Sequence, residues 1–269
     1  MKKIALLFLS VLAMSAFGYG ASSKIASPKG EKWYDTRAYK LVFVRARFAG
    51  GETVASMIKY GREELGLRVV FGINGGYFGQ VRRNGCVVRF GIGLFMVDGI
   101  DLSECPAPVN RGRICQTDGG VVIAFKIPEG CDSAIEGGPI LLLDGHILRD
   151  YQGFTKAHWN RKCLRTVIAT KGKHTVYLLR FYDSLWNVQK WLKRNGFDDA
   201  SNLDGGSSSE PWAKVRNAVL VCRIKPWNQE IKGTKVHSSP TPAGQFFKDS
   251  WIWGTTKKPD DLYFPFWQK

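Results

Sequence analysis

Residues 200–210 read ASNLDGGSSSE, a strand-like run followed by an acidic residue, two glycines and three serines. Asp204 is poorly suited to a hydrophobic core, and glycines allow positive φ and close approach of a ligand to the backbone. Ser207 and Ser208 add hydroxyl and N–H groups beside the carboxylate. The stretch therefore predicts a strand that ends by presenting Asp204 to a binding site.

Two earlier stretches share this arrangement: residues 73–78 (INGGYF) and residues 135–139 (IEGGP). Asn74, Glu136 and Asp204 each stand directly before two glycines, which predicts three strand ends that meet at one site. The alternative is three separate tight turns. The expected substrate-binding residues are Gly75, Gly76, Gly137, Gly138, Gly205, Gly206, Ser207 and Ser208.

The motifs INGGYF, EGGPILLLDG, LRTVIAT and NLDGGSSS follow one another between about Thr53 and Ile224. Together they resemble the phosphodiester glycosidase family, with NLDGGSSS as the most specific of them. The resemblance implies an exported hydrolase that cleaves a sugar-1-phosphodiester at the glycosidic bond, and it does not indicate the sugar. The sequence departs from the family at Glu136, where members commonly carry Ser, and at Ala169 and Thr170, which replace a Gly-containing end.

This chemistry assigns roles to four candidate catalytic residues. Asp204 and Glu136 supply carboxylates that activate water or stabilise an oxocarbenium-like transition state at the anomeric carbon. Arg165 matches the geometry of phosphate oxygens, and Asn74 is expected to hold a sugar hydroxyl or the attacking water. No metal-ligand spacing is present, so we assign no metal ligand and no cofactor, while the carboxylates leave metal dependence open. His158 and His174 are alternative acid–base groups.

The first 20 residues predict a secretory signal peptide, because Lys2 and Lys3 precede a short apolar run that ends in small residues. The run is shorter than the roughly 20 residues that span a membrane. We therefore expect a periplasmic or secreted protein without a transmembrane anchor after cleavage. Residues 21–38 are expected to form a polar leader, and residues 39–269 a glycosidase-like domain with an aromatic-rich extension from Lys225.

Six cysteines, an even number in an exported chain, predict disulfides concentrated between Cys86 and Cys131. The formal net charge is +16, and removal of the signal peptide leaves about +14. A basic surface has affinity for nucleic acid, but no nucleic-acid motif is present, so an anionic envelope polymer is the better-motivated partner. A basic surface with no such partner remains the alternative.

The whole pattern predicts an α+β fold: a single domain with mixed sheets flanked by a few helices and stabilised by disulfides. Apolar periodicity and turn residues predict strands at residues 39–48, 67–73, 93–97, 121–127, 140–143, 164–170, 174–182 and 219–224. Caps at Thr53 and at Asp183 or Ser184 predict helices over residues 53–65 and 185–195, and Asn84-Gly85 predicts a hairpin. Residues 98–119 are expected to form a disulfide-held loop, and residues 150–162 a surface loop or a sugar-contacting one.

Two functions follow from these observations. The first is hydrolysis of a sugar-1-phosphodiester in an envelope glycan or glycolipid. The alternative is a non-catalytic protein that binds a glycan or an anionic polymer with the same pocket. A Ser–His–Asp hydrolase and a nucleotide hydrolase are disfavoured, because the nucleophile elbow and the P-loop are both absent.

Overall fold

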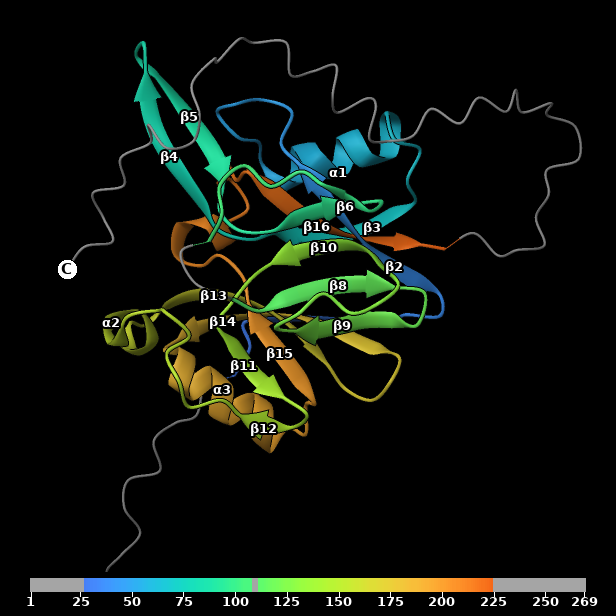
Figure 1. The fold of residues 1–269 in the computed structure, drawn as a ribbon, viewed down its shortest axis with the longest axis vertical. Coiled ribbons are helices and arrows are strands. Elements are labelled where there is room, and N and C mark those ends of the chain that lie inside the picture. The colour runs from blue at the N-terminus through green and yellow to red at the C-terminus, as the bar shows by residue number, and fades with distance from the viewer. Residues whose placement is uncertain (1–26, 108–110, 225–269) are drawn as a thin grey trace, which may run out of the picture.

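The computed structural model describes residues 27–107 and 111–224, which form a single domain of four β-sheets with few helices (Figure 1). The expected signal peptide and the aromatic-rich extension from Lys225 lie outside the described residues. In the part of the chain that is described, no helix has the length and apolar character needed to cross a membrane.

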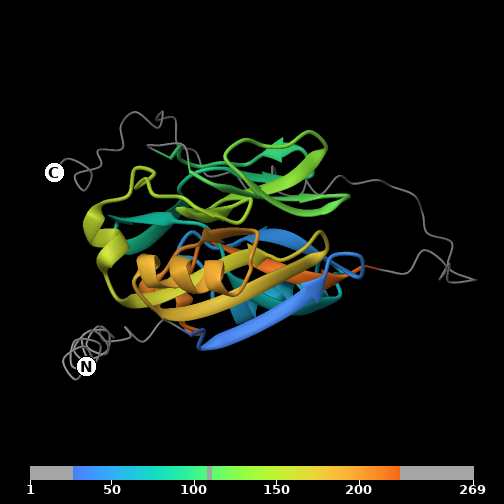
Figure 2. The ribbon, with the colours of Figure 1, turned by 90° about the horizontal axis from the view of Figure 1, so that it is seen from below.

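The largest sheet has six strands in the order β1-β14-β13-β15-β11-β12. These strands are β1 Gly30–Asp35, β14 Thr175–Asp183, β13 Cys163–Thr170, β15 Asp199–Asn202, β11 Ile140–Leu143 and β12 His146–Ile147. One face is covered by α3 (Leu185–Arg194) and by the short α2 (Lys156–Asn160), as Figure 2 shows for α3. Ser184 caps α3 as expected, since its side chain accepts a hydrogen bond from the N–H of Asn187.

The other face of this sheet packs on a three-stranded sheet in the order β2-β16-β3. Its strands are β2 Tyr39–Arg45, β16 Asn217–Arg223 and β3 Val69–Asn74, and α1 (Val54–Glu63) connects β2 to β3. Thr53 caps α1, and Gly66 follows its end with φ +62°. Ile168, Leu178, Val219 and Val221 are buried where the two sheets meet.

A five-stranded sheet in the order β7-β6-β10-β8-β9 closes the third side of this core. Its strands are β7 Ile100–Asp101, β6 Phe95–Val97, β10 Cys131–Glu136, β8 Arg113–Thr117 and β9 Gly120–Ala124. The hairpin of β4 (Phe78–Arg83) and β5 (Cys86–Gly91) projects from the body of the domain (Figure 1). Its turn residues Asn84 and Gly85 have φ of 48° and 78°, the conformation that the Asn-Gly pair predicts.

The expectation of mixed sheets is wrong for the described residues, because every pairing between these strands is antiparallel. In the structure β16 lies between β2 and β3 and pairs antiparallel with both. A strand from the end of the domain thus separates two strands that are close in sequence.

The expected disulfides are absent: all six cysteines belong to the described residues and all are free. Cys115 is fully buried and has Cys131 as its neighbour; burial first, and then the hydrogen bond with Cys131, raise the pKa of the Cys115 thiol to about 12. Cys115 therefore serves as a small apolar core residue. The region expected to be a disulfide-held loop instead contains β7 and β8, whose backbone ladders hold it in place.

Two further expectations about loops are corrected. The polar leader of residues 21–38 is a strand from Gly30 onward, since β1 pairs with β14 along six residues. Its polar composition suits an exposed edge strand, where charged side chains discourage pairing with another chain. Residues 150–162 contain α2, whose Trp159 is fully buried beneath α3.

Candidate active site

The three polar-Gly-Gly corners lie together, joined by backbone hydrogen bonds. The N–H of Asp204 donates to the carbonyl of Gly75 (3.1 Å), which joins the end of β3 to the end of β15. The N–H of Gly138 donates to the carbonyl of Asn202 (2.5 Å), which joins the second corner to the same strand. The structure therefore brings together the three strand ends that the sequence motifs predict.

Three of the six paired glycines are required because the backbones of the corners approach closely. An ideal Cβ would lie 2.4 Å from the carbonyl oxygen of Glu136 at Gly76 and 2.8 Å from the carbonyl oxygen of Asn202 at Gly137. At Gly205 it would lie 2.8 Å from the carbonyl oxygen of Leu164. Backbone atoms cannot move aside as a flexible side chain does, so a methyl group does not fit at these positions.

Replacing Gly76 with alanine should lower the free energy of unfolding by about 1–3 kcal/mol, the usual cost of overpacking. The matched control is Gly30→Ala, because a Cβ at Gly30 would meet only the Cβ of Arg180, at 3.9 Å. We expect the control to stay within about 0.5 kcal/mol of the wild type. Urea unfolding followed by tryptophan fluorescence measures both. Equal stability of the two variants would contradict the close approach of the corners.

Asp204 follows β15 directly, and its carboxylate is held by the loop that comes after it. Its Oδ1 accepts a hydrogen bond from the N–H of Gly205 (2.9 Å), and the Ser208 hydroxyl also bonds to the carboxylate. Burial raises the pKa of Asp204 to about 6, against the lowering effect of these bonds and of Arg111 and Arg165. The carboxyl group is therefore mostly ionised at pH 7 and takes up a proton in mildly acidic solution.

Two buried guanidinium groups, those of Arg165 and Arg111, interact electrostatically with Asp204. Each of these residues is 2% exposed, and burial lowers the pKa of both. The NH2 group of Arg165 donates to the carbonyls of His158 (2.7 Å) and Arg161 (2.9 Å) at the end of α2. Its NH1 lies 3.3 Å from Nε2 of His158. Positive charge therefore exceeds negative charge around Asp204, as an anionic ligand requires.

Aromatic rings form the wall behind these arginines. The Arg111 guanidinium lies over the rings of Tyr77 (5.0 Å) and Phe154 (4.7 Å). Burial raises the pKa of the Tyr77 hydroxyl, which stays neutral and donates to the carbonyl of Gly138 (2.9 Å). His158 stacks on Phe154, and burial followed by the charges of the nearby arginines lowers its pKa to about 4. The imidazole is thus neutral at pH 7.

Asn74 and the serines mainly support the Asp204 corner. The Asn74 side chain donates to the carbonyl of Asp204 (2.7 Å) and accepts from the Thr166 hydroxyl (2.7 Å). Both of its polar atoms are thus engaged within the protein. Ser208 is buried against the Asp204 carboxylate, whereas Ser207 is exposed. Gly206 lies in the same turn with φ +63°.

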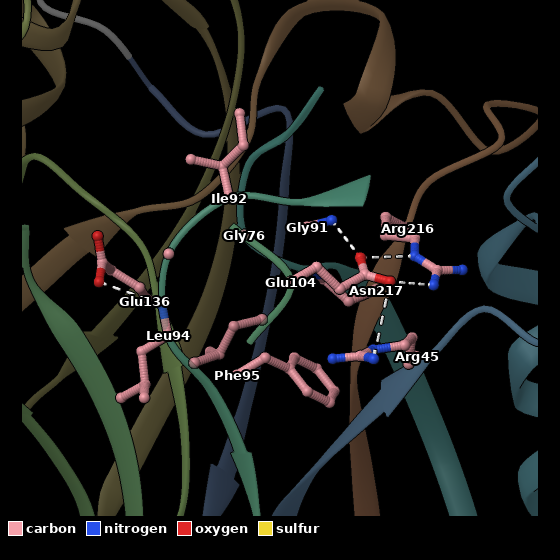
Figure 3. Close-up of a pocket in the computed structure, with 12 residues that line it drawn as sticks. Arg45, Gly76, Gly91, Ile92, Leu94, Phe95, Glu104, Glu136, Arg216 and Asn217 are labelled. Carbon is pink, nitrogen blue, oxygen red and sulfur yellow. Dashed lines mark hydrogen bonds and ion pairs between the residues drawn. The ribbon is translucent and has the colours of Figure 1, made fainter. Parts of the chain in front are cut away.

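The Glu136 carboxylate interacts electrostatically with Arg111 but makes its hydrogen bond outside this group. It is 6% exposed and rests against the loop of Gly93 and Leu94, where its Oε2 accepts from the Leu94 N–H at 3.2 Å. Figure 3 shows it on the far side of Leu94 from the buried cluster of Arg45, Glu104 and Arg216. Burial raises the pKa of Glu136, and among the described charges Arg111 and then Arg113 oppose that shift.

Sequence reasoning missed three residues of this site. Arg111 stands in an irregular stretch before β8. The residues around it in sequence do not distinguish it from the arginines that lie at the surface. Tyr77 and Asn202 lie within the quoted motifs, yet their roles depend on the bond between them, from Asn202 Nδ2 to the Tyr77 hydroxyl (2.9 Å). Within the described residues, no three His, Cys, Asp or Glu side chains gather as a metal site would require.

Known structures share this arrangement of sheets. A protein from Synechocystis described as hypothetical matches with a TM-score of 0.56 at 14% identity, over 72% of this chain and 59% of its own. The catalytic domain of zebrafish N-acetylglucosamine-1-phosphodiester alpha-N-acetylglucosaminidase, auto-inhibited by its pro-peptide, matches with a TM-score of 0.51 at 16% identity, over 75% of this chain and 85% of its own. At such identities the likeness establishes the fold.

The family follows from the sequence itself. The family model described as phosphodiester glycosidase matches residues 67–238, more than half of the 269-residue chain and all three polar-Gly-Gly corners. The chain belongs to the phosphodiester glycosidase family. No curated protein matches the chain.

Proposed function

We propose that this protein hydrolyses the glycosidic bond of a sugar-1-phosphodiester, with Asp204 acting at the anomeric carbon. The observation that carries the proposal is one carboxylate with a raised pKa beside two buried guanidinium groups, at the point where the family motifs meet. A phosphodiester of a sugar offers both an anion for the arginines and an anomeric carbon for the carboxylate. The family membership supports the same reaction class.

The bond that breaks joins the anomeric carbon to the phosphate oxygen. The electrons of that bond pass to the oxygen, and the phosphate leaves as a monoester while a water oxygen bonds to the carbon. The leaving group is already acidic and needs little protonation, which fits a neutral His158 in place of a cationic acid. Arg111 and Arg165 stabilise the growing negative charge on phosphate. Asp204, ionised at pH 7, takes the proton of the water or stabilises the positive charge on the sugar.

The substrate and compartment in this proposal remain those that the sequence predicts. The protein acts after export, in the periplasm or outside the cell, on an envelope glycan or glycolipid. The excess of lysine and arginine, +16 for the full chain, attracts anionic polymers of this kind. Asn74, Gly75, Gly76, Gly137, Gly138, Gly205, Gly206 and Ser208 shape the pocket, and Ser207 is available to the substrate from the surface.

A non-catalytic glycan-binding protein is the second candidate, and one observation favours it. Two of the four residues predicted to be catalytic, Asn74 and Arg165, donate side-chain hydrogen bonds to backbone carbonyls of the protein. A site that holds its polar groups in this way binds a ligand without needing to rearrange them. Binding alone would then be the function of the pocket.

Turnover of a panel of sugar-1-phosphodiesters distinguishes the two. The panel contains the methyl phosphodiesters of N-acetylglucosamine, glucose, galactose and mannose, and phosphorus NMR follows release of methyl phosphate. We expect release from at least one member by the wild-type protein and none above background by Asp204→Asn. Saturable binding of the panel without any release by the wild type would refute hydrolysis and support the binding protein.

A further inference from the structure

A cavity of about 610 Å³ is lined in part by Glu136 and has no part in the proposed reaction. Its walls come from the end of β10, the start of β8 and the segment after β7. Glu136 and Arg113 line it, together with Leu94, Asp101 and Pro106. A volume of this size accommodates a sugar ring with its substituents.

The Glu136 carboxylate brings an unused acceptor to this cavity. Its Oε1 is buried and has no hydrogen-bond partner among the described residues, whereas Oε2 accepts from the N–H of Leu94. Gly93 makes room for the carboxylate, since a Cβ there would lie 2.8 Å from its Cδ. Leaving a buried carboxylate oxygen without a donor is costly, so a donor group supplied beside Glu136 would be favourable.

Arg113 brings an unused donor to the same cavity. It lies directly opposite Glu136 in the antiparallel pair of β8 and β10, so both side chains stand on one face of the sheet. No ion pair joins these two residues, because the NH1 group of Arg113 donates instead to the carbonyl of Phe125 at 2.6 Å. Its Nε is buried and finds no acceptor in the described part of the chain.

The chemistry of these walls selects the ligand. An acceptor and a donor side by side match the adjacent hydroxyl groups of a sugar, each of which both donates and accepts. Leu94 and Pro106 offer apolar surface to the C–H groups of a ring. Glu104 is paired with Arg216 and Arg45, which leaves the carboxylates of Asp101 and Glu136 facing one cation on the wall, Arg113, and disfavours a phosphate group. No three potential metal ligands gather anywhere in the described residues, which disfavours a cation.

The cavity also lies within electrostatic reach of the reaction site, because Arg111 interacts with both Glu136 and Asp204. We propose that it is a subsite for an uncharged sugar unit, with Glu136 accepting and Arg113 donating hydrogen bonds to adjacent hydroxyls. This inference rests on the proposed function in one respect. The sugar unit bound in this cavity is the neighbour, along the glycan, of the sugar unit whose glycosidic bond is cleaved. The substrate is then a glycan of two or more sugars.

Two backbone amides make the test specific to each site. The Leu94 N–H bonds to Glu136 and reports on the cavity, while the Gly205 N–H bonds to Asp204 and reports on the reaction site. The full chain labelled with ¹⁵N is titrated with glucose, N-acetylglucosamine, glucosamine and inorganic phosphate. We expect glucose or N-acetylglucosamine to shift the Leu94 amide saturably, and phosphate to leave it unchanged. A shift at Gly205 alone, or at Leu94 with glucosamine alone, would overturn the neutral-sugar subsite.

Variants then assign the binding to this cavity. Glu136→Gln weakens the acceptor and should reduce sugar affinity at the Leu94 amide about tenfold, as expected for loss of a charge-assisted hydrogen bond. Ala107→Trp fills the cavity from its rim and should abolish the shift. Glu129→Gln, the same change at an exposed carboxylate, is the control and should keep wild-type affinity. Unchanged affinity in both cavity variants overturns the assignment. These titrations measure no turnover. A protein that binds sugar at the Leu94 amide but hydrolyses no sugar-1-phosphodiester would therefore refute the proposed function and leave the subsite in place.

Discussion

Replacing Asp204 with asparagine should lower the turnover of a sugar-1-phosphodiester by about 10²–10⁴-fold, the usual contribution of a positioned acid or base. Asparagine keeps the shape and the oxygen that accepts from the Gly205 N–H, and it removes only the charge. Affinity for the substrate should change far less than turnover. The control is Asp144→Asn, the same substitution before another glycine, at an exposed turn. Full turnover in Asp204→Asn would end the catalytic role of this residue.

The pH dependence of the wild type tests the same group. Burial raises the pKa of Asp204 to about 6, and the reaction needs the ionised form, so kcat/KM should fall as the pH drops through about 6.

The effect of pH on the free energy of unfolding has the opposite sign. Because the folded-state pKa lies above the unfolded value, the stabilisation from this group is present below the unfolded pKa of about 3.8 and is lost as pH rises through about 6.

It follows that Asp204→Asn should be at least as stable as the wild type at pH 8, where the buried charge is costly. Thermal unfolding of both proteins at pH 5 and pH 8 measures this difference. A lower melting temperature of the variant at pH 8 would show that the carboxylate mainly holds the serine loop. The measurement thus separates a catalytic carboxylate from a structural one.

Replacing Arg165 with lysine should reduce both turnover and stability, although the charge is kept. The guanidinium donates to the carbonyls of His158 and Arg161 while its NH1 faces the site, and one ammonium group cannot reach all of these positions. We expect about a hundredfold loss of turnover, as for removal of one donor that stabilises a transition state. The two uncovered carbonyls should cost about 1–3 kcal/mol of stability.

Arg37→Lys is the matched control for this change, since Arg37 is exposed and, among the described residues, pairs with Asp35 alone. Such surface pairs contribute little to stability. Inhibition by inorganic phosphate gives an independent measurement: affinity for phosphate should fall in Arg165→Lys and stay constant in the control. A variant with lower stability but wild-type turnover and phosphate affinity would assign Arg165 only to the docking of α2.

The sequence alone determined the elements whose signals are local. Thr53 and Ser184 cap α1 and α3 where expected, because a cap depends only on residues within one turn. The Asn84-Gly85 turn forms its hairpin for the same reason. The three polar-Gly-Gly motifs predicted strand ends that meet, and the structure shows them in backbone contact. The family, too, was recognisable from these motifs.

Only the tertiary structure decided which distant segments pair and what they bury. β16 separates β2 from β3 and pairs antiparallel with both. The polar β1 becomes an edge strand because β14 offers it a partner. Cys115 is a free core residue because β8 places it inside the five-stranded sheet. Arg111 interacts with Asp204 and with Glu136, although Glu136 makes its hydrogen bond to the Leu94 N–H. Each of these outcomes depends on contacts between residues far apart in the chain, and the residues around each position carry no signal for its distant partner.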